Sequence, residues 1–366
     1  MEWNKIWNCV LEEKILSKKV YLITGGCGFI GSCLIRELLK DDNIKVINID
    51  KLSYASNPSA IGEVSKDNYI FYQEDISDRN SITNIIKDHN PHYIINLAAE
   101  SHVDRSIDGP EVFIKSNITG TFNILDLSYQ YWLDLGEDLK SKFKFIHVST
   151  DEVYGTLNAN EKPFIEESAY KPNNPYSASK ASSDHLVRAW YETYNFPSII
   201  TNTTNNYGPW QFYEKLIPLV ITKCLNGQPI PIYGDGKQVR DWIHVEDHVN
   251  GILTVLSKGS AGEKYNIGNN NEIENITVVN TICNLLDDLL SFEKGHHNKL
   301  IQFVKDRPGH DQRYALNNKK VLSLGWKPQI EWDDGIKSTI EWYLKNKNYL
   351  NPKDKESYSG ERLGTI

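Results

Sequence analysis

The chain has 366 residues, 40% of them hydrophobic, and a formal net charge of −8, which is enough apolar sequence to bury a core spread over about two domains. The acidic balance argues against a nucleic-acid partner, because tracking a phosphate backbone needs clustered Lys and Arg. No run approaches the roughly 18 apolar residues of a membrane span, and charged side chains interrupt the start of the chain where a signal peptide needs an apolar core.

Strand-like and helix-like segments alternate from Val20 to about Tyr194. Short apolar runs predict strands, and apolar residues at helical spacing predict helices. We expect strands at 20–24, 45–49, 69–73, 93–97 and 143–149, and helices at 29–39, after Ser77, through 118–125 and from Ser177. This alternation predicts an α/β fold with a Rossmann-like doubly wound parallel sheet. Because such sheets bind ligands beyond the carboxyl ends of their strands, motifs at those ends should share one site.

A glycine-rich segment, 25–31, follows the first strand and opens the first helix. Glycines in this context make a tight turn and let the backbone approach a pyrophosphate. Asp50 ends the second strand, where a carboxylate can accept bonds from both ribose hydroxyls of adenosine and repel a 2′-phosphate. We therefore predict NAD rather than NADP. Asp75 and Ile76 are expected to flank the adenine, with a helix cap as the alternative for Asp75.

A second group of motifs carries acid, base and redox chemistry: Thr150-Asp151-Glu152 and the pair Tyr176 and Lys180. Tyr and Lys at i and i+4 share one helical face, and an ammonium near the phenol is expected to lower the pKa of Tyr176 and make it a base for a hydroxyl. Adjacent carboxyls in a strand point to opposite faces, so we expect irregular backbone at 151–152. The alternatives are a solvated acidic turn and a surface helix pair.

Beyond about Tyr207, prolines and glycines punctuate shorter elements, which is typical of a smaller lobe with longer connections. Any diphosphate ligand of this acidic protein would need local cations, and Arg240 and Arg307 are the candidates to bind it. We expect an N-terminal extension at 1–18, a NAD-binding Rossmann domain at 19–206 with returning segments near 240–266, a mainly substrate-binding lobe at 207–346 and a polar tail at 347–366.

Together with 97–101, 205–209, 214–218, 240–242 and 306–311, these motifs make the chain resemble the extended short-chain dehydrogenase/reductase superfamily and, within it, the dTDP-glucose 4,6-dehydratase family. The resemblance extends from about Lys19 to Tyr343. It implies that a hydride leaves C4 of a nucleotide-diphospho-glucose for NAD, that water is eliminated across C5 and C6, and that the hydride returns to C6. The product would be a 4-keto-6-deoxy sugar nucleotide. dTDP-glucose is the expected substrate, with UDP-glucose as the alternative.

The resemblance also implies roles. Tyr176, helped by Lys180 and Thr150, would take the C4 hydroxyl proton, Glu152 would abstract the C5 proton, and protonated Asp151 would donate to the departing C6 hydroxyl. Burial and the carboxylate neighbour are expected to raise the pKa of Asp151. The implied cofactor contacts are Gly25, Gly28, Phe29, Ile30, Gly31, Asp50, Lys51, Asp75, Ile76, Leu97, Ala98, Ala99, Ser101, Ser116, Tyr176, Lys180 and Asn206.

Further substrate contacts implied by the resemblance are Ser101, Thr150, Asn205, Lys215, Leu216, Asn266, His310 and Tyr314, with Pro231, Ile232 and Tyr233 lining the base pocket. Plain alternatives remain open: a surface ion pair for Arg240 and Asp241, a turn for Asn266, and hydrogen-bonded core or loop positions for Ser101 and Ser116. Two other functions compete, a sugar-nucleotide 4-epimerase and a protein that senses NAD without turnover.

The five cysteines are scattered and form no C-x-x-C pair, so we expect neither zinc nor disulfides, and a reducing cytoplasm. His244 and His248 share i,i+4 spacing, but Glu246 does not complete an H-E-x-x-H motif, and no metal is expected. By analogy with the superfamily, the helices at Val112–Leu125 and from Ser177 are expected to form a homodimer interface.

Overall fold

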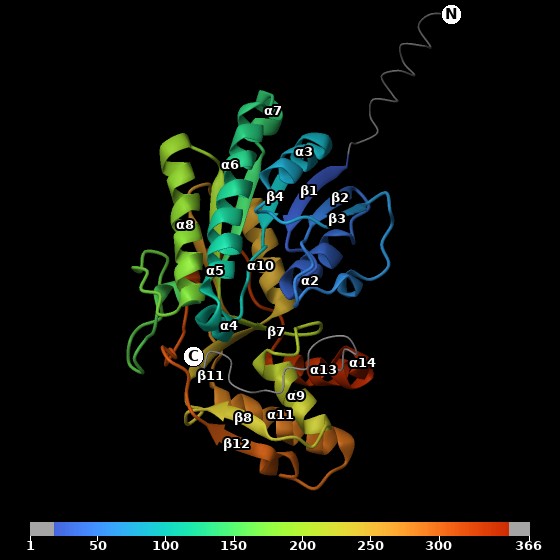
Figure 1. Ribbon diagram of the computed structural model, residues 1–366, viewed down its shortest axis with the longest axis vertical. Coiled ribbons are helices and arrows are strands. Elements are labelled where there is room, and N and C mark those ends of the chain that lie inside the picture. Colours follow the sequence, from blue (N-terminus) through green and yellow to red (C-terminus); the bar gives the residue numbers. More distant parts are fainter. Residues whose placement is uncertain (1–17, 351–366) are drawn as a thin grey trace, which may run out of the picture.

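The computed structural model describes residues 18–350 (Figure 1). A large parallel sheet with helices on both faces forms the upper part of the molecule in this view, and a smaller lobe of short strands and helices lies below it. The extension predicted at 1–18, apart from Lys18, and the tail beyond Leu350 lie outside the described residues.

Seven strands form the large sheet in the order β10-β6-β5-β4-β1-β2-β3, and every neighbouring pair is parallel. The order reverses at β1, with β2 and β3 on one side and the other four strands on the other, which confirms the doubly wound prediction. Both faces are covered, which explains why the strands read as nearly continuous apolar runs. The strands are β1 (Lys19–Thr24), β2 (Ile44–Ile49), β3 (Tyr69–Tyr72), β4 (Tyr93–Asn96), β5 (Lys144–Thr150), β6 (Ser198–Thr203) and β10 (Lys264–Ile267).

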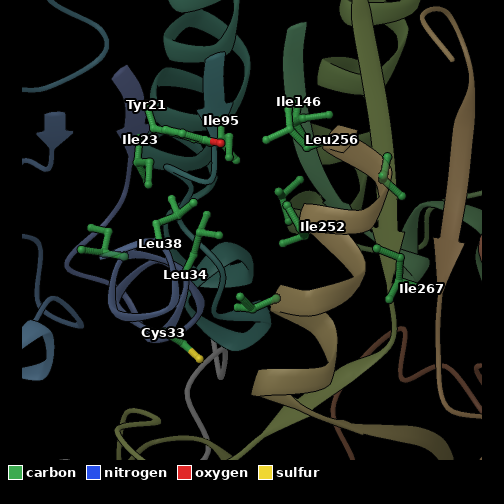
Figure 2. Packing of buried hydrophobic residues seen from close by; sticks show 14 of the residues in the cluster. Tyr21, Ile23, Cys33, Leu34, Leu38, Ile95, Ile146, Ile252, Leu256 and Ile267 are labelled. Carbon is green, nitrogen blue, oxygen red and sulfur yellow. The ribbon is translucent and has the colours of Figure 1, made fainter. Parts of the chain in front are cut away.

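Two helices, α2 (Phe29–Leu38) and α10 (Val245–Lys258), pack on one face of the sheet. Figure 2 shows Leu34 and Leu38 from α2 and Ile252 and Leu256 from α10 turned toward the strands. On the other face, a second apolar cluster includes residues of α3 (Arg79–His89), α6 (Gly120–Leu133) and α8 (Pro175–Tyr194). Because these two clusters pack the helices against the sheet, the first turns of the helices hold a defined position relative to the ends of the strands.

The helix predicted to begin near Val112 has an irregular start. A short helix α5 (Pro110–Phe113) leads into the π-helical segment η2 (Ile114–Thr119) before α6 begins. Within η2 the side-chain amide of Asn117 pairs with the backbone of Glu100, accepting from its N–H at 2.8 Å and donating to its carbonyl oxygen at 3.0 Å. The wider helical turn is thus tied to the segment that follows β4.

The lobe has its own core, in which Tyr207, Ile232 and Tyr343 are buried. Its helices are α9 (Leu216–Leu225), α11 (Asn275–Leu290), α13 (Trp332–Lys345) and α14 (Lys347–Leu350). One small sheet has the strand order β11 (Glu272–Glu274), β9 (Val239–His244), β7 (Asn205–Tyr207), and a second sheet pairs β12 (Ile301–Val304) with β8 (Ile230–Tyr233). Leu350 is buried in this core, so the tail predicted from 347 begins with a packed helical turn.

The remaining short elements are η1 (Pro58–Ile61), α4 (Val103–Asp108), α7 (Glu137–Lys140), η3 (Asp151–Tyr154), η4 (His297–Leu300) and α12 (Lys319–Ser323). None of the helices between residues 18 and 350 is both long and apolar enough to cross a bilayer.

Candidate active site

A cavity opens where the strands of the large sheet end, and it is lined from both sides of the switch point between β1 and β4. All the residues predicted to contact a cofactor line it, as do all five predicted catalytic residues. Of the remaining predicted substrate contacts, Asn205 and Lys215 line it and the others do not. The motifs predicted to share one site are therefore brought together.

The glycine loop forms one end of the cavity. Gly25 has a φ of 71°, and a Cβ atom there would lie 2.7 Å from the backbone nitrogen of Ala98. A Cβ on Gly31 would lie 2.3 Å from the carbonyl oxygen of Gly25. Only glycine lets the loop pack this closely against the chain after β4 and against the start of α2. The first residues of α2 therefore face the cavity with exposed backbone N–H groups, a geometry that fits a pyrophosphate.

Asp50, at the end of β2, is buried and already holds the neighbouring backbone. Its Oδ2 accepts from the N–H of Cys27 at 2.9 Å, and its Oδ1 accepts from the N–H of Leu52 and the hydroxyl of Ser56. The carboxylate thus ties the glycine loop to the segment 51–56, and it also lines the cavity. Asp75 lines the cavity too, and the cap of α3 is Asp78. The helix-cap alternative for Asp75 is therefore wrong.

Lys51 joins two other parts of the cavity wall. Its ammonium donates to the hydroxyl of Ser116 at 2.8 Å and pairs with the carboxylate of Glu100 at 2.8 Å. Ser116 is therefore both hydrogen-bonded within the protein and part of the cavity lining. Ser101 also lines the cavity, and its carbonyl oxygen accepts from Lys215 of the lobe at 2.9 Å.

Helix α8 begins just before Tyr176. Asn174 caps it, accepting from the N–H of Ser177, and the reciprocal Ser177 contact completes a capping box with Pro175 in the first turn. Tyr176 and Lys180 both face the cavity, as predicted from their spacing. The predicted effect on the phenol is wrong, however. Burial, followed by the charge of Glu152, raises the pKa of Tyr176, and hydrogen bonding with Thr150 opposes this.

The physical reason lies in the position of the ammonium. The Nζ of Lys180 donates to the carbonyl oxygen of Val148 at 2.8 Å. Burial lowers the pKa of Lys180 to about 8, and only the charge of Asp184 works against it. A partly desolvated ammonium anchored on the strand does not offset the removal of Tyr176 from water.

Asp151 and Glu152 form the short helical turn η3 directly after β5, which confirms the irregular backbone predicted there. Thr150 caps the turn, accepting from the N–H of Glu152 at 3.3 Å. One carboxyl oxygen of each acid, Oδ2 of Asp151 and Oε2 of Glu152, is buried without a hydrogen-bond partner. Both oxygens are therefore buried within the protein, and the alternative of a solvated acidic turn is wrong.

The two carboxyls have different electrostatic surroundings. Burial and then the charge of Glu152 raise the pKa of Asp151 well above its ordinary value, in agreement with the expectation of a protonated acid. Burial also raises the pKa of Glu152, but the positive charges of Arg307, Arg240 and Lys215 oppose the effect. The cations of the lobe thus favour ionisation of Glu152 over that of Asp151.

Several predicted substrate residues lie outside the cavity lining. The guanidinium of Arg240 donates to the carbonyl oxygens of Val239, Gln312 and Asp311 and lies 4.2 Å from the ring centroid of Tyr314. Asp241 accepts three backbone N–H groups from 269–271. The two side chains are buried and bonded to different groups, so the alternative of a surface ion pair is wrong.

Asn266 lies in β10 rather than in a turn, and its amide is used within the protein. It accepts from the hydroxyl of Tyr154 at 3.0 Å and donates to the carbonyl oxygen of Phe164. The side chain of Ile232 packs in the core of the lobe, and Leu216 and Pro231 are half-buried. His310 contacts Asp306 through Nδ1 at 2.6 Å, and the hydroxyl of Tyr314 donates to Asp311.

Arg307 is held by the segment after β4. Its guanidinium donates to the buried carboxylate of Asp104 at 3.0 Å, and Asp104 also accepts from the hydroxyl of Tyr233 at 3.0 Å. A second contact lies nearby, where the guanidinium of Arg105 donates two hydrogen bonds to the carboxylate of Glu214, from Nε at 3.1 Å and from Nη2 at 2.6 Å. Helix α4 therefore joins the large sheet to the lobe next to Lys215.

Asn206 is oriented by three neighbours. Its Oδ1 is 2.9 Å from Nδ1 of His248, and its Nδ2 donates to Thr203 and to the carbonyl oxygen of Thr204. Residues 18–350 contain no group of three or more side chains placed to bind a metal ion. The cavity also includes residues that the sequence did not single out, namely Ile49, Ser53, Ala55, Ser56, Glu74, Val148, Ser149, Thr203, Thr204, Gln211 and Phe212.

Four features together define an extended short-chain dehydrogenase/reductase. They are a parallel doubly wound sheet, a glycine loop after its first strand, an acidic residue at the end of its second strand, and a Tyr and a Lys on a helix beside them. A family model described as GDP-mannose 4,6 dehydratase matches residues 22–339. dTDP-glucose 4,6-dehydratase 1 of Escherichia coli K12 is 51% identical over 340 residues, covering 90% of this chain and 94% of that protein. The Haemophilus influenzae dTDP-glucose 4,6-dehydratase is 52% identical over 330 residues, covering 89% and 98%.

Solved structures agree. DesIV, a dTDP-glucose 4,6-dehydratase from Streptomyces venezuelae with NAD and TYD bound, matches with a TM-score of 0.82 and 38% identity, covering 91% of this chain and 99% of that one. A UDP-glucose 4-epimerase from Thermotoga maritima matches with a TM-score of 0.78 and 28% identity, covering 90% and 99%. The chain belongs to the dTDP-glucose 4,6-dehydratase family, which confirms the resemblance found in the sequence.

Proposed function

We propose that the protein is an NAD-dependent hydro-lyase that converts dTDP-glucose to the 4-keto-6-deoxy sugar nucleotide and water. The observation that carries this proposal is the pair of buried, unpartnered carboxyl oxygens of Asp151 and Glu152 in the same cavity as Tyr176 and the glycine loop. An epimerase needs the phenol, the lysine and NAD, but it does not need an acid and a base for elimination. A protein that only senses NAD needs none of these side chains.

Bound NAD would supply the hydride chemistry, which requires acceptance of a hydride from C4 of the sugar and its return to C6. The glycine loop and the amino end of α2 fit its pyrophosphate, and Asp50 is placed at the end of β2 for the adenosine ribose. We assign the predicted cofactor residues that line the cavity to this ligand. Asn206, fixed by His248 and Thr203, is assigned to the nicotinamide end.

Oxidation at C4 requires that the hydroxyl proton be removed. Tyr176 is the base, and Thr150, which hydrogen-bonds with it, is the group that favours its ionised form. Burial disfavours the phenolate in this structure, so the positive charge of Lys180 is needed when the substrate is seated. Lys180 lines the same cavity and has two N–H donors beyond the one used by Val148.

Elimination across C5 and C6 needs one ionised and one protonated carboxyl. Glu152, whose ionised form is favoured by Arg307, Arg240 and Lys215, is the base for the C5 proton. Asp151, whose pKa is raised by burial and by Glu152, keeps its proton and delivers it to the departing C6 hydroxyl. Environments that push two neighbouring pKa values apart assign the acid and the base.

The lobe at 207–346 is the proposed substrate side, and the sheet with its glycine loop at 19–206 is the cofactor side. Lys215 and Asn205 line the cavity and are assigned to the sugar nucleotide, and Arg307, held by Asp104, is the candidate for the diphosphate. The curated relatives named dTDP-glucose 4,6-dehydratases support dTDP over UDP. One thymine methyl changes binding by roughly 1 kcal/mol, so we expect a several-fold preference.

Incubation of the purified protein with NAD and either dTDP-glucose or UDP-glucose tests the function. A dehydratase produces the alkali-induced absorbance of a 4-keto-6-deoxy sugar, and the signal should be larger with dTDP-glucose. Tyr176→Phe is the matched control and should abolish the signal. Formation of only the galactose isomer would identify an epimerase, and NAD binding without any product would identify a sensor.

We also propose that the protein is a homodimer. The surface formed by α5, η2 and α6 exposes Val112, Ile114 and Phe122, and Phe122 contacts Trp190 of α8 edge-on. Exposed large apolar side chains gathered on neighbouring helical segments are typical of a protein interface. The described cysteines are all free thiols, which supports a reducing compartment such as the cytoplasm.

A further inference from the structure

A buried polar network lies beneath Lys180, on the side of the ammonium away from the cavity. His147 of β5 and Asp184 of α8 are at most 1% exposed, and neither lines the cavity. The Nε2 of His147 is 3.4 Å from the Nζ of Lys180 and also 3.4 Å from Oδ1 of Asp184. Burying an imidazole and a carboxylate in the middle of a sheet is costly unless each has a defined partner.

A backbone N–H and the single proton of a hydroxyl favour one direction for the hydrogen bonds in this network. The N–H of Ala98 can only donate, and it donates to the hydroxyl of Thr24 at 3.2 Å. The Thr24 hydroxyl donates its own hydrogen bond to Oδ1 of Asn96 at 2.6 Å. The amide nitrogen of Asn96 then faces Nδ1 of His147 at 3.1 Å and donates to it. Nδ1 is therefore an acceptor, and the ring proton of neutral His147 sits on Nε2.

A proton on Nε2 determines what Lys180 can do. With its proton on Nε2, His147 cannot accept a hydrogen bond from Lys180, and Oδ1 of Asp184, which has no hydrogen-bond partner, lies 3.4 Å from Nε2. One ammonium N–H goes to the carbonyl oxygen of Val148, which leaves two for the cavity. Asp184 is held in turn by Tyr170, whose hydroxyl donates to Oδ2 at 2.8 Å, and by Nδ2 of Asn202 at 3.1 Å.

The charges of the groups around Lys180 support the same arrangement. The groups that face Lys180 are His147 from β5 and Tyr176 and Asp184 from its own helix, with the Asp151–Glu152 turn beyond Tyr176. Burial lowers the pKa of His147 to about 4, so the imidazole is neutral. Asp184 has a lowered pKa, because contacts with His147 and the charge of Lys180 outweigh its burial. It is thus the buried negative charge that opposes the desolvation of Lys180.

We infer that His147 and Asp184 are positioning residues that keep Lys180 protonated and turn its free N–H donors toward the bound cofactor and Tyr176. His147 does so as an Nε2–H group that lies beside Asp184 and cannot accept a hydrogen bond from the ammonium. Asp184 does so as a countercharge. Neither residue touches the cavity. The inference rests on the proposed function, in which Lys180 assists Tyr176.

Asp184→Asn tests the inference because it removes the charge and leaves the shape. The alkaline limb of kcat for dTDP-glucose should move to lower pH by roughly one unit or more, the size expected when a close opposite charge is lost. Tyr170→Phe is the matched control, because it deletes one hydrogen bond to Asp184 without changing its charge, and its limb should stay near that of the wild type. An unmoved limb in Asp184→Asn overturns the inference.

A measurement on the unmodified protein decides the matter even if Asp184→Asn does not fold. Nitrogen-15 NMR of histidine-labelled protein should show His147 as the neutral Nε2–H tautomer from about pH 6 to about pH 9. An Nδ1–H tautomer, or a charged ring in that range, overturns the inference. Absence of dehydration by the wild-type enzyme would instead refute the proposed function, and the NMR result would still report on the network.

Discussion

Asp151 and Glu152 are covalent neighbours, yet their carboxyl groups differ in electrostatic environment. Burial raises the pKa of both groups. The cations Arg307, Arg240 and Lys215 of the lobe oppose this rise at Glu152, whereas the charge of Glu152 adds to it at Asp151. The turn η3 makes this possible by ending β5 one residue before the pair. Four predictions concern these acids and the cavity they share, and a fifth concerns the assembly.

Glu152→Gln should leave NAD bound and reduce turnover of dTDP-glucose by about 100-fold or more, because amide oxygen cannot take the C5 proton. In a single turnover, NADH formed by C4 oxidation should accumulate and persist, and its absorbance reports this directly. Glu167→Gln, an exposed acid outside the cavity, serves as the control and should behave as the wild type. Normal turnover in Glu152→Gln would refute its role as the base.

Asp151→Asn should lose dehydration and gain stability at alkaline pH. The pKa of Asp151 is well above its ordinary value in the folded protein, so between those two values the folded state binds more protons than the unfolded chain. Stability then falls as pH rises through this window. The Tm of the variant should exceed that of the wild type at about pH 8 by roughly 2–4 °C and by less at about pH 5.

Asp67→Asn, exposed and outside the cavity, is the control for this shift. Equal Tm differences at the two pH values would mean that Asp151 is ionised in the folded protein.

Asp50→Asn should weaken NAD binding by about 10-fold or more, the loss expected for a hydrogen bond to a charged group. Discrimination against NADP should narrow at the same time, because the repulsion of a 2′-phosphate is gone. Titration with both cofactors measures this, and Asp42→Asn, at an exposed position before β2 and away from the cavity, is the control. Equal affinity of the wild type for NAD and NADP would contradict the role given to Asp50.

Arg105→Ala should loosen the contact between α4 and the lobe. The side chain of Glu214 is 2% exposed, and it would lose its bidentate partner next to Lys215. We expect a lower Tm and a several-fold higher KM for the sugar nucleotide. Arg188→Ala removes an exposed helical pair with Glu192 and should change neither value. A variant with unchanged KM would show that this tie does not position the substrate side.

Ile114→Glu should convert the dimer to a monomer, because it places a charge in the apolar surface of η2, where Ile114 is 54% exposed. Light scattering after size-exclusion chromatography measures the mass. Ile165→Glu, at a similarly exposed position away from these helices, is the control. A dimer that survives the Ile114 change, or a wild-type monomer, would refute the proposed interface.

The sequence predicted five of the seven strands of the large sheet, because a strand covered on both faces reads as an apolar run between turns. It did not predict β6 and β10. It also placed the cavity, since the glycine loop, Asp50, the segment 97–101 and the Asp151–Glu152 pair each follow a strand. The sign of the Tyr176 pKa shift was beyond reach, because burial and an ammonium compete and the outcome depends on where Lys180 donates. The i,i+4 spacing indicates a shared face but not that the Nζ reaches the carbonyl of Val148.

For other residues of the site, no pattern in the sequence indicated their place. Ser53, Ala55 and Ser56 line the cavity only because Asp50 ties their segment to the glycine loop. His147 and Asp184 are polar residues within a strand and a helix, and nothing near them in the sequence shows that they meet under Lys180. Tertiary contacts of this kind become visible only when the strand order is known.

The place of β10 at the border of the large sheet has a consequence for synthesis. It pairs with β6 only after the chain has passed through α9, β8, β9 and α10. Until residue 267 has left the ribosome, the outer border of β6 has no partner strand and is open to pairing with other nascent chains. Synthesis of the first part of the lobe therefore precedes completion of the large sheet, and polypeptides that stop short of β10 should aggregate.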